Sequence, residues 1–485
     1  MLKNILEGRF DEVTEYNRSD LASNIVHIGF GAFHRGHQAV YNDMTNAISS
    51  EKWGICEINM FGPADLIENL RKQDHQFSVV ETSKSGVTKR LVRTVTESIH
   101  TPLDGIESAI QKLVEPQVRI VSMTITEKGY CADPQSRTLD QSNPLIAHDL
   151  ENPSNPKSAI GLVTEALRIR KNKGLDAFSV MSCDNIPENG ALTKGVVVEF
   201  ARIIDADLGE WIAQNVTFPS SMVDRIVPAM TEEEFDIIEE ATGYRDPCGI
   251  VCEDFRQWVI EDDFVAGRPD WDKAGATLVR DVLPYEEMKL RMLNGSHSFL
   301  AYNGSLAGYD YIYQCMEDEQ LKSVTQKLMI DEQGRSLSPS LDVNLEEYAE
   351  LLIDRFSNPN IKHKTYQIAM DGSQKLPQRA LDPFLTLQER GVEAKIQPVI
   401  IAGWMHYLMN AQQTSTEIHD PLAMTFQDIM ASFSDKASVA SGLLGIQSVF
   451  GEHGKDNKEL IDGVMKAFND ISERGIKKTI ENLAQ

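Results

Sequence analysis

Short apolar runs alternate with amphipathic stretches along roughly the first 280 residues of the chain. Four runs are dense in Val, Ile, Phe and Met, as strands buried on both faces are, and they are Asn24–Phe30, Gly54–Met60, Val118–Thr124 and Ala177–Ser182. Helical patterns separate them, at His37–Ile48, Ala64–Lys72, Ile106–Leu113 and Ser158–Arg170. The alternation predicts a mostly parallel sheet that helices cover on both faces. A further pair of runs, Phe77–Thr82 and Thr88–Val95, predicts an antiparallel hairpin that decorates this sheet, with its turn at Ser83–Gly86.

Beyond residue 280 the pattern becomes helical. The predicted helices are Tyr285–Leu306, Glu317–Met329, Leu345–Arg355, Leu385–Arg390 and onward, Pro398–Met409 and Asn457–Phe468. A chain of 485 residues also exceeds the length at which a single core keeps growing. We therefore predict an α/β domain over residues 1–284, followed by a largely α-helical domain over residues 285–485 that carries the substrate and catalytic residues.

Composition narrows the choice of partners. The chain has 73 acidic and 47 basic residues, a formal charge of −26, which disfavours binding to nucleic acid or to anionic lipid. Six cysteines are scattered, and only Cys248 and Cys252 lie close together, so we expect neither disulfides nor a bound metal. The first residues lack the features of a secretory signal, and no apolar stretch is long enough for a membrane helix. We expect a cytoplasmic monomer or small homo-oligomer.

The loop after the first apolar run carries the pattern Gly29-Phe30-Gly31. Glycines at these two places permit a tight turn and a close approach of the backbone to a pyrophosphate, and the next helix begins with free amides. His34 stands where a third glycine is usual, so a plain strand–loop–helix turn is the alternative. The neighbouring His34, Arg35 and His37 are costly to bury unless they bind something or form a local ion-pair cluster with Glu57 or Asp43.

An acidic group after the second run would accept the adenosine ribose hydroxyls and repel a 2′-phosphate, which favours NAD over NADP. Glu57, Asn59 and Asp65 are the candidates. The first domain is thus predicted to be a Rossmann-type dinucleotide-binding domain. Its expected cofactor contacts are Ile28, Gly29, Phe30, Gly31, Ala32, Phe33, His34, Arg35, Asn59, Asp65 and Thr124.

The segment Tyr285–Tyr302 places Glu286, Lys289, Asn294 and His297 on one arc of a helix, at roughly 100° per residue. Reduction of a ketone develops negative charge on oxygen, which requires a proton donor and hydrogen-bond donors. Lys289 can supply the proton, Asn294 and His297 can donate hydrogen bonds, and Glu286 can relay protons to solvent. The alternative is a polar arc that faces water, with Asn294-Gly295 marking a helix end.

Two more segments end predicted strands, where ligands of parallel sheets bind. Asn185 follows the fourth run and could donate to the same oxygen; its alternative role is to cap the helix that begins near Glu188. Asp224 and Arg225 close another short run, and they could equally pair with each other.

Six separated motifs occur in order: GFGAFHRGHQA, TITEKGY, SCDNIPENG, MVDRIVPA, MKLRMLNGSHSFLAY and MDGSQKLPQR. Together they resemble the long-chain mannitol dehydrogenase family. The resemblance implies a metal-free mechanism in which Lys289 is the acid/base and Asn185 and Asn294 polarise the carbonyl oxygen. It further implies that His297 lies beside the substrate, that Glu286 lines a proton path, and that Asp224 and Lys375 belong to the substrate pocket.

Within the family, stretches such as FRQWVIED and DGSQKLPQR are most similar to members that reduce hexuronates. Gln367 stands where polyol-specific members typically carry arginine, which implies a sugar acid rather than mannitol. We expect NAD-dependent interconversion of D-fructuronate and D-mannonate, with a mannitol or arabinitol 2-dehydrogenase and a non-catalytic sensor as the alternatives. A uronate carboxylate needs a cation. The candidates are Arg379, Lys375, His363 and Lys364, with Arg225 and Arg256 from the first domain.

Overall fold

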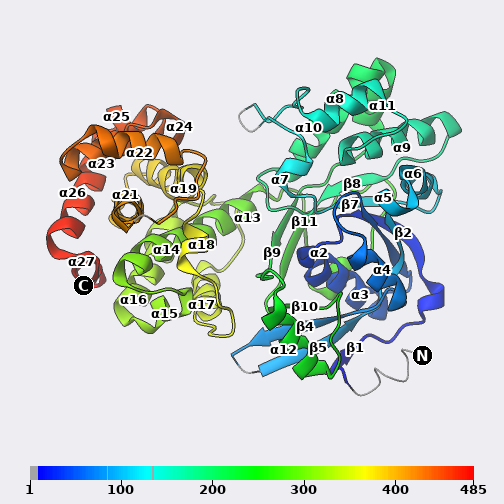
Figure 1. The fold of residues 1–485 in the computed structure, drawn as a ribbon, viewed down its shortest axis with the longest axis horizontal. Coiled ribbons are helices and arrows are strands. Elements are labelled where there is room, and N and C mark those ends of the chain that lie inside the picture. The colour runs from blue at the N-terminus through cyan, green and yellow to red at the C-terminus, as the bar shows by residue number, and fades with distance from the viewer. Residues whose placement is uncertain (1–8, 85, 134–135, 415) are drawn as a thin grey trace. The chain divides into compact units, whose positions relative to one another are not determined.

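The computed structural model describes residues 9–84, 86–133, 136–414 and 416–485. The chain divides into two compact units, Met1–Leu283 and Pro284–Gln485, which are coloured blue to green and green to red in Figure 1. The division falls one residue before the predicted boundary. Unit 1 holds all the described strands, and unit 2 is helical.

The centre of unit 1 is a parallel sheet in the order β6-β3-β2-β7-β8. Its strands are β2 (Ala22–Ile28), β3 (Trp53–Asn59), β6 (Val95–His100), β7 (Ile120–Met123) and β8 (Ser179–Ser182). The first of them, β2, lies between β3 and β7, so the strand order reverses there. In sheets of this kind the ligand crevice opens at the carboxyl ends of the strands on either side of that reversal.

The sheet is apolar on both faces because helices and loops cover both. Val26, Val121 and Val180 pack against helices α6 (Ile106–Val114), α9 (Ala159–Lys173) and α10 (Asn189–Ile204) on one face. On the opposite face, Ile25 and Ile120 pack with Tyr41 of α3 (Gln38–Ile48) and with three buried tryptophans. The predicted Rossmann-type arrangement is therefore confirmed, and the near-continuous apolar runs have their physical explanation.

The predicted hairpin forms, but in a different sheet. Strands β4 (Phe77–Ser83) and β5 (Gly86–Val92) pair antiparallel, within a separate four-stranded sheet of order β1-β5-β4-β10. The expected strand Thr88–Val95 is wrong in its bounds, because it combines most of β5 with the first residue of β6. β6 is a separate strand, and it belongs to the parallel sheet. Both Val92 and Val95 are buried, so the apolar pattern does not reveal the break between them.

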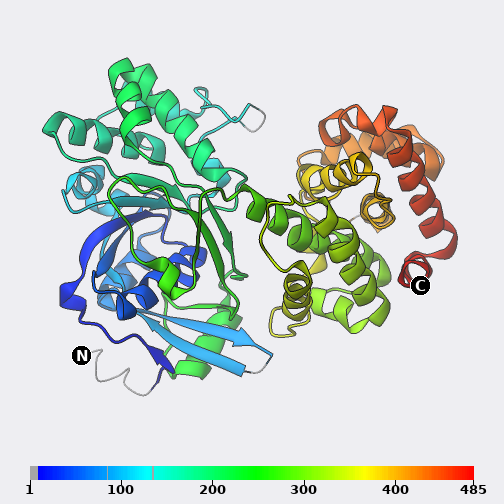
Figure 2. The same cartoon turned by 180° about the vertical axis from the view of Figure 1, so that it is seen from behind.

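The remaining strands are β1 (Glu12–Val13), β9 (Ser221–Asp224), β10 (Ile250–Glu253), β11 (Gln257–Glu261) and β12 (Thr277–Val279). The last sheet has the order β12-β11-β9. The other α-helices of unit 1 are α2 (Ala32–Gly36), α4 (Asp65–Lys72), α5 (Thr101–Asp104), α7 (Thr126–Gly129), α8 (Pro144–Glu151), α11 (Ala206–Asn215) and α12 (Glu232–Thr242). Figure 2 shows α12, a green helix with three glutamates in its first turn, beside the blue β4–β5 hairpin.

Unit 2 surrounds one large apolar core that includes Trp404, Phe426 and Phe450. Its α-helices are α13 (Leu283–Met288), α14 (Ser296–Ala307), α15 (Ile312–Glu317), α16 (Glu319–Lys327), α17 (Leu345–Phe356), α18 (Thr365–Ala369), α19 (Gly372–Leu376), α20 (Asp382–Glu389), α21 (Gln397–Thr414), α22 (Ala423–Ser432), α23 (Lys436–Leu444), α24 (Gln447–Phe450), α25 (His453–Asp456), α26 (Lys458–Arg474) and α27 (Ile476–Ala484). Three π-helical segments join some of them, and these are Lys289–Gly295, Leu328–Gly334 and Pro377–Leu381.

None of the helices in the described ranges is long and apolar enough to cross a bilayer. The six cysteines are all buried free thiols.

Candidate active site

The turn after β2 requires glycine at position 29. Gly29 has φ of +109°, and a Cβ built there would lie 2.1 Å from the backbone oxygen of Thr124. The Thr124 hydroxyl donates to the Gly29 carbonyl at 2.8 Å, and the Gly31 amide donates to the same carbonyl at 2.7 Å. β2 and β7 therefore approach so closely here that a side chain at position 29 would force them apart.

A cavity of about 270 Å³ opens at this turn. It is lined by Ile28, Gly29, Phe30, Gly31, Asn59, Met60, Phe61, Thr124, Ile125, Gly129, Leu145, Ser158 and Ala159. The side-chain oxygen of Asn59 accepts a hydrogen bond from the Phe30 amide at 2.7 Å, which fixes the turn against the end of β3. A glycine cradle beside an open cavity fits the close approach of a dinucleotide phosphate.

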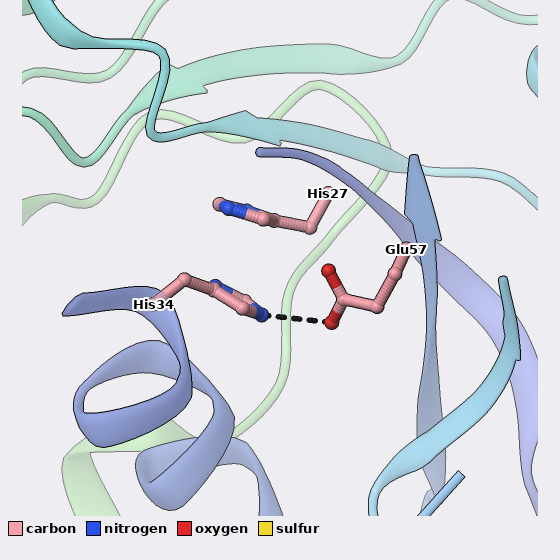
Figure 3. A group of neighbouring side chains, drawn as sticks. All are labelled: His27, His34 and Glu57. Atoms are coloured by element: carbon pink, nitrogen blue, oxygen red, sulfur yellow. Dashed lines mark hydrogen bonds and ion pairs between the residues drawn. The ribbon is translucent and has the colours of Figure 1, made fainter. Parts of the chain in front are cut away.

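His34 lies inside the protein and does not reach this cavity. Its Nε2 contacts Oε1 of Glu57 at 2.8 Å, and both side chains are fully buried (Figure 3). The ring of His27 stacks on that of His34, with centroids 3.5 Å apart. The local-cluster alternative therefore holds for the side chain of His34, which is enclosed beneath the turn, and a contact of His34 with the cofactor stays a prediction.

Arg35 also braces the loop from within. Its Nε donates to the Gly31 carbonyl at 3.2 Å and its Nη1 donates to the Cys248 carbonyl at 2.5 Å. This buried guanidinium ties the turn to the end of a neighbouring loop. We therefore treat Arg35 as a structural residue rather than as a direct phosphate contact.

The ligand atoms of His27, His34 and Glu57 lie within 4.8 Å of one another, close enough to raise the question of a metal. Their geometry is that of a hydrogen-bonded stack. Nearly parallel rings cannot direct lone pairs at one point, as a tetrahedral zinc site requires. Both nitrogens of His27 are already within 2.8 Å of hydroxyls, Ser122 at Nδ1 and Thr124 at Nε2. A metal-free mechanism stays a prediction.

Burial decides the protonation of the pair. Desolvation raises the pKa of Glu57 from 4.5 to about 8, and it lowers the pKa of His34 from 6.5 to about 3. Both shifts favour neutral groups, with the proton on the carboxyl. At neutral pH the protonated Glu57 donates to Nε2 of a neutral His34.

The three candidates for ribose binding differ in their position relative to the cavity. Glu57 is enclosed and bonded to His34, so the possibility that it contacts ribose is removed. Asn59 lines the cavity, and its side-chain oxygen already serves the turn. Asp65 is exposed in the first turn of α4 and does not line the cavity as it stands.

The end of β8 is held by Asp184, a residue that sequence reasoning passed over. Its carboxylate accepts the amides of Ile125 and Thr126 at 2.9 and 3.0 Å, and the Tyr130 hydroxyl at 2.7 Å. Desolvation raises the pKa of this carboxyl. An acid placed directly before Asn185, at a strand end, was the available signal. The network fixes the backbone next to the exposed Asn185.

Asn185 does not cap α10. The residue at the cap position is Glu188, and Asn189 instead joins two strands. The Asn189 amide donates to the carbonyls of Asp184 and Ser221, and its oxygen accepts the Ser221 amide. The capping alternative for Asn185 is therefore wrong, and its catalytic role stays a prediction.

Asp224 ends β9 and is buried, but Arg225 beside it belongs to the interior. The Arg225 guanidinium contacts Glu81 at 2.6 Å and donates to the carbonyls of Gly36 and Glu253. Burial raises the pKa of Glu81, but Arg225 and the neighbouring arginines outweigh it and lower that pKa overall. Arg225 therefore holds unit 1 together, and we withdraw it as a substrate-binding cation.

In unit 2, the predicted helix Tyr285–Leu306 is continuous from α13 to α14. The stretch Lys289–Gly295 is π-helical, so Asn294-Gly295 lies within the helix and does not end it. Gly295 permits this helix to pack closely against the segments that carry Gln333 and Arg379. A Cβ at position 295 would lie 2.5 Å from Nε2 of Gln333 and 2.9 Å from the Arg379 carbonyl. π-Helical turns occur frequently at functional sites.

The four polar residues predicted on this helix are buried. Glu286, Lys289 and His297 are each 6% exposed, and Asn294 is 8% exposed. A polar arc that faces water is therefore excluded. Among the described residues, neither Nδ2 of Asn294 nor Nε2 of His297 has a hydrogen-bond partner. Two buried donor positions on one helix fit a substrate oxygen or hydroxyl.

Three more of the predicted substrate-binding residues lie near His297 of α14, and they are His363, Lys375 and Arg379. The rings of His297 and His363 meet with centroids 5.2 Å apart. Burial lowers the pKa of His297, and His363, Arg379 and Lys375 add to the effect by their proximity. The predicted residues His297, His363, Lys375 and Arg379 thus form one cluster within unit 2.

The comparisons with known proteins agree with these features. The model of the mannitol dehydrogenase Rossmann domain matches residues 23–273, and the model of the mannitol dehydrogenase C-terminal domain matches residues 281–472. The chain belongs to the mannitol dehydrogenase family and is an oxidoreductase of that family. The predicted family and fold class are confirmed.

Three relatives illustrate the range of similarity. D-mannonate oxidoreductase of Escherichia coli (strain K12) is 47% identical over 472 residues, which cover 96% of this chain and 97% of that protein. The uncharacterized oxidoreductase YdfI of the same strain is 48% identical, with 96% of each chain covered. Pseudomonas fluorescens mannitol 2-dehydrogenase, solved as a ternary complex with NAD and D-mannitol, is 35% identical with a TM-score of 0.82, over 96% of this chain and 95% of that one.

We expect Gly29→Ala to lower NADH affinity at least tenfold, because the new methyl group must displace the Thr124 carbonyl. Titration of NADH fluorescence measures the affinity. Gly174→Ala is the matched control, since Gly174 also has positive φ, at +67°, but has no neighbour within 4 Å of a built Cβ. Equal NADH affinities for the two variants would contradict the close-approach explanation.

Glu57→Gln tests the protonated carboxyl. Because the folded-state pKa is raised, the stability that the proton contributes is complete below about pH 4.5 and is lost as pH rises through about 8. The glutamine does not titrate. We expect urea unfolding to show the wild type losing stability relative to the variant between about pH 4.5 and about pH 8, with no further loss at higher pH. A difference that stays constant over this range would show that the folded pair holds no extra proton.

Proposed function

We propose that the protein interconverts D-fructuronate and D-mannonate with NADH and NAD. The observation that carries the proposal is the cluster in unit 2, where donor groups of Asn294 and His297 lie beside Lys375 and Arg379. The donors suit a ketone and hydroxyls, and the cations suit a carboxylate. The 47% identity with a D-mannonate oxidoreductase, against 35% with a mannitol 2-dehydrogenase, supports the same choice.

NAD is the proposed cofactor, and it supplies or accepts the hydride when bound. The Gly29–Gly31 turn, Thr124 and Asn59 would hold its phosphates and the adjacent ribose, because they line the cavity at the switch point of the sheet. We propose Asp65 for the adenosine ribose, since it follows β3 and its carboxylate is exposed. Its charge would repel a 2′-phosphate and so favour NAD over NADP.

The proposed chemistry uses Lys289 as the acid. In the direction of reduction, its ammonium group donates a proton to the substrate oxygen as negative charge develops there. The amides of Asn294 and Asn185 donate hydrogen bonds to that oxygen, and His297 holds a neighbouring hydroxyl. Glu286 returns a proton to Lys289, and Asp224 with Lys375 holds the remaining hydroxyls.

The charge of the chain sharpens the need for local cations. A formal charge of −26 repels an anionic substrate over the surface as a whole. Binding of a sugar acid therefore depends on positive groups inside the site, such as Lys375 and Arg379. A neutral polyol would give these cations no counter-charge.

Steady-state kinetics with NADH test the substrate. We expect kcat/KM for D-fructuronate to exceed that for D-fructose, which carries a hydroxymethyl group in place of the carboxylate, by at least about 100-fold, the order of one charge-assisted contact. A higher value for D-fructose would indicate a polyol dehydrogenase. Undetectable NADH oxidation across uronates and ketoses would indicate a non-catalytic sensor.

Lys289→Ala tests the acid. We expect kcat to fall about 10³-fold, in the range of a lost general acid, while NADH binding changes less than about threefold. Lys327→Ala is the control, because within the described ranges Lys327 donates only to the carbonyls of Leu483 and Ala484 of the same unit. Turnover near the wild-type rate in Lys289→Ala would assign the proton donor to another group.

A further inference from the structure

We propose that Arg379 binds the carboxylate of the substrate and thereby selects a sugar acid over a neutral ketose. The inference rests on the proposed function and deepens it. It identifies one cation among the six that the sequence left open.

Arg379 has no acidic partner in the part of the chain that the structure describes. Among the described residues, its guanidinium contacts only the Asn294 carbonyl at 3.3 Å and the Ser298 hydroxyl at 3.1 Å, both through Nη1. A guanidinium carries five N–H donors, so most of them are left for another acceptor. Lys375 likewise forms no ion pair with any residue in the described ranges.

Other arginines of the chain are satisfied differently. Arg225 meets Glu81, Arg71 meets Asp104, and Arg168 meets Glu165. Arg170, which lacks a carboxylate, donates to four backbone carbonyls instead. Among the described residues, Arg379 has neither a carboxylate partner nor a set of backbone carbonyls that uses its donors. Its guanidinium can therefore accept an anionic ligand as a partner.

The surroundings make this arrangement costly without a ligand. Burial lowers the pKa of Arg379 to about 10 and that of Lys375 to about 8, since both cations are largely removed from water and lie near each other. A desolvated charge that lacks a counter-charge destabilises the fold. A bound carboxylate offsets that cost and forms a charge-assisted, bidentate contact with the guanidinium.

The position of Arg379 matches the length of the substrate. Asn294, which we propose to contact the ketone oxygen, and Ser298 are four residues apart, or roughly 6 Å along a helix. Arg379 lies beside that turn because it contacts both residues. In a six-carbon 2-keto uronate, four carbon–carbon bonds of about 1.5 Å separate the ketone carbon from the carboxylate carbon. The two ends can therefore be held from the same helix turn.

The competing cations are less suited. Nζ of Lys375 already donates to the carbonyls of Ile368 and Met370, at 3.2 and 2.5 Å. Burial lowers the pKa of His363 to about 4, so this imidazole is neutral at pH 7. Arg256 lies 3.4 Å from Glu81, which also engages Arg225.

Lys364 is the last of the six. Its ammonium group lies over the ring of Tyr366, 5.7 Å from the centroid, in the first turn of the helix that Lys364 precedes. Among the described candidates, Arg379 presents a planar guanidinium whose Nε and Nη2 form no hydrogen bond or ion pair and which lies near His297, the arrangement that suits a bidentate carboxylate.

The experiment compares Arg379→Gln with the wild type on D-fructuronate and D-fructose. We expect the ratio of the two kcat/KM values to fall at least 100-fold, through a higher KM for the uronate, and Arg379→Lys to recover part of it. Isothermal titration with D-mannonate should show a matching loss of affinity. The control is Arg390→Gln, because among the described residues Arg390 donates only to the carbonyls of Arg335 and Leu337.

Ser298→Ala provides a second test that does not depend on the folding of the arginine variants. It removes one contact to Nη1 and leaves the charge in place, so we expect a smaller loss of the ratio, about five- to tenfold. NADH titration and thermal melting verify that each variant is folded. An unchanged ratio in folded Arg379→Gln overturns the inference while the proposed function stands. A wild type without uronate activity overturns both.

Discussion

A buried charge needs a counter-charge or hydrogen bonds, and this constraint explains much of how the chain arranges its interior. Asp184 at the end of β8 is met by two amides and a tyrosine hydroxyl, and Arg225 is met by Glu81. The Glu57–His34 pair satisfies the same constraint in another way, since the carboxyl keeps its proton. Unit 1 thereby obtains a rigid frame around the glycine turn. In unit 2 the constraint is left unmet at Arg379, and the departure marks the place where a ligand completes the structure.

The fold could be predicted from the sequence where the pattern of apolar residues matches the burial of the strand. Strands β2, β3, β7 and β8 of the parallel sheet are buried on both faces, so their apolar runs were continuous and could be located in the sequence. β6 was missed because Val92 and Val95 are both buried across a break of only two residues. Local pattern carries no information about which sheet a strand joins, so the hairpin was assigned to the wrong one.

The candidate site was harder to predict from the sequence, because the environment of each site residue is set by contacts between segments that lie far apart in the chain. Position alone could not separate the cavity-lining Asn59 from the enclosed Glu57, two residues earlier on the same strand. His34 lies in α2, directly after a turn of the kind that binds ligands in many proteins, but its side chain bonds to Glu57 of β3 and is enclosed. Conversely, Lys375 and Arg379 were found from the sequence as cations, but only the structure shows that neither meets an acid.

The π-helical segment Lys289–Gly295 has a consequence for the helix as a whole. Each residue of an α-helix turns the chain by about 100°, and a π-helix turns it less. The segment therefore sets the rotational phase between the proposed acid and everything after it, much as an inserted residue would. If the same seven residues were wound as an α-helix, each would turn the chain further, and His297 and Ser298 would be rotated relative to Lys289 with no change in their chemistry. The winding of this short stretch is thus as much a part of the site as the identity of its side chains.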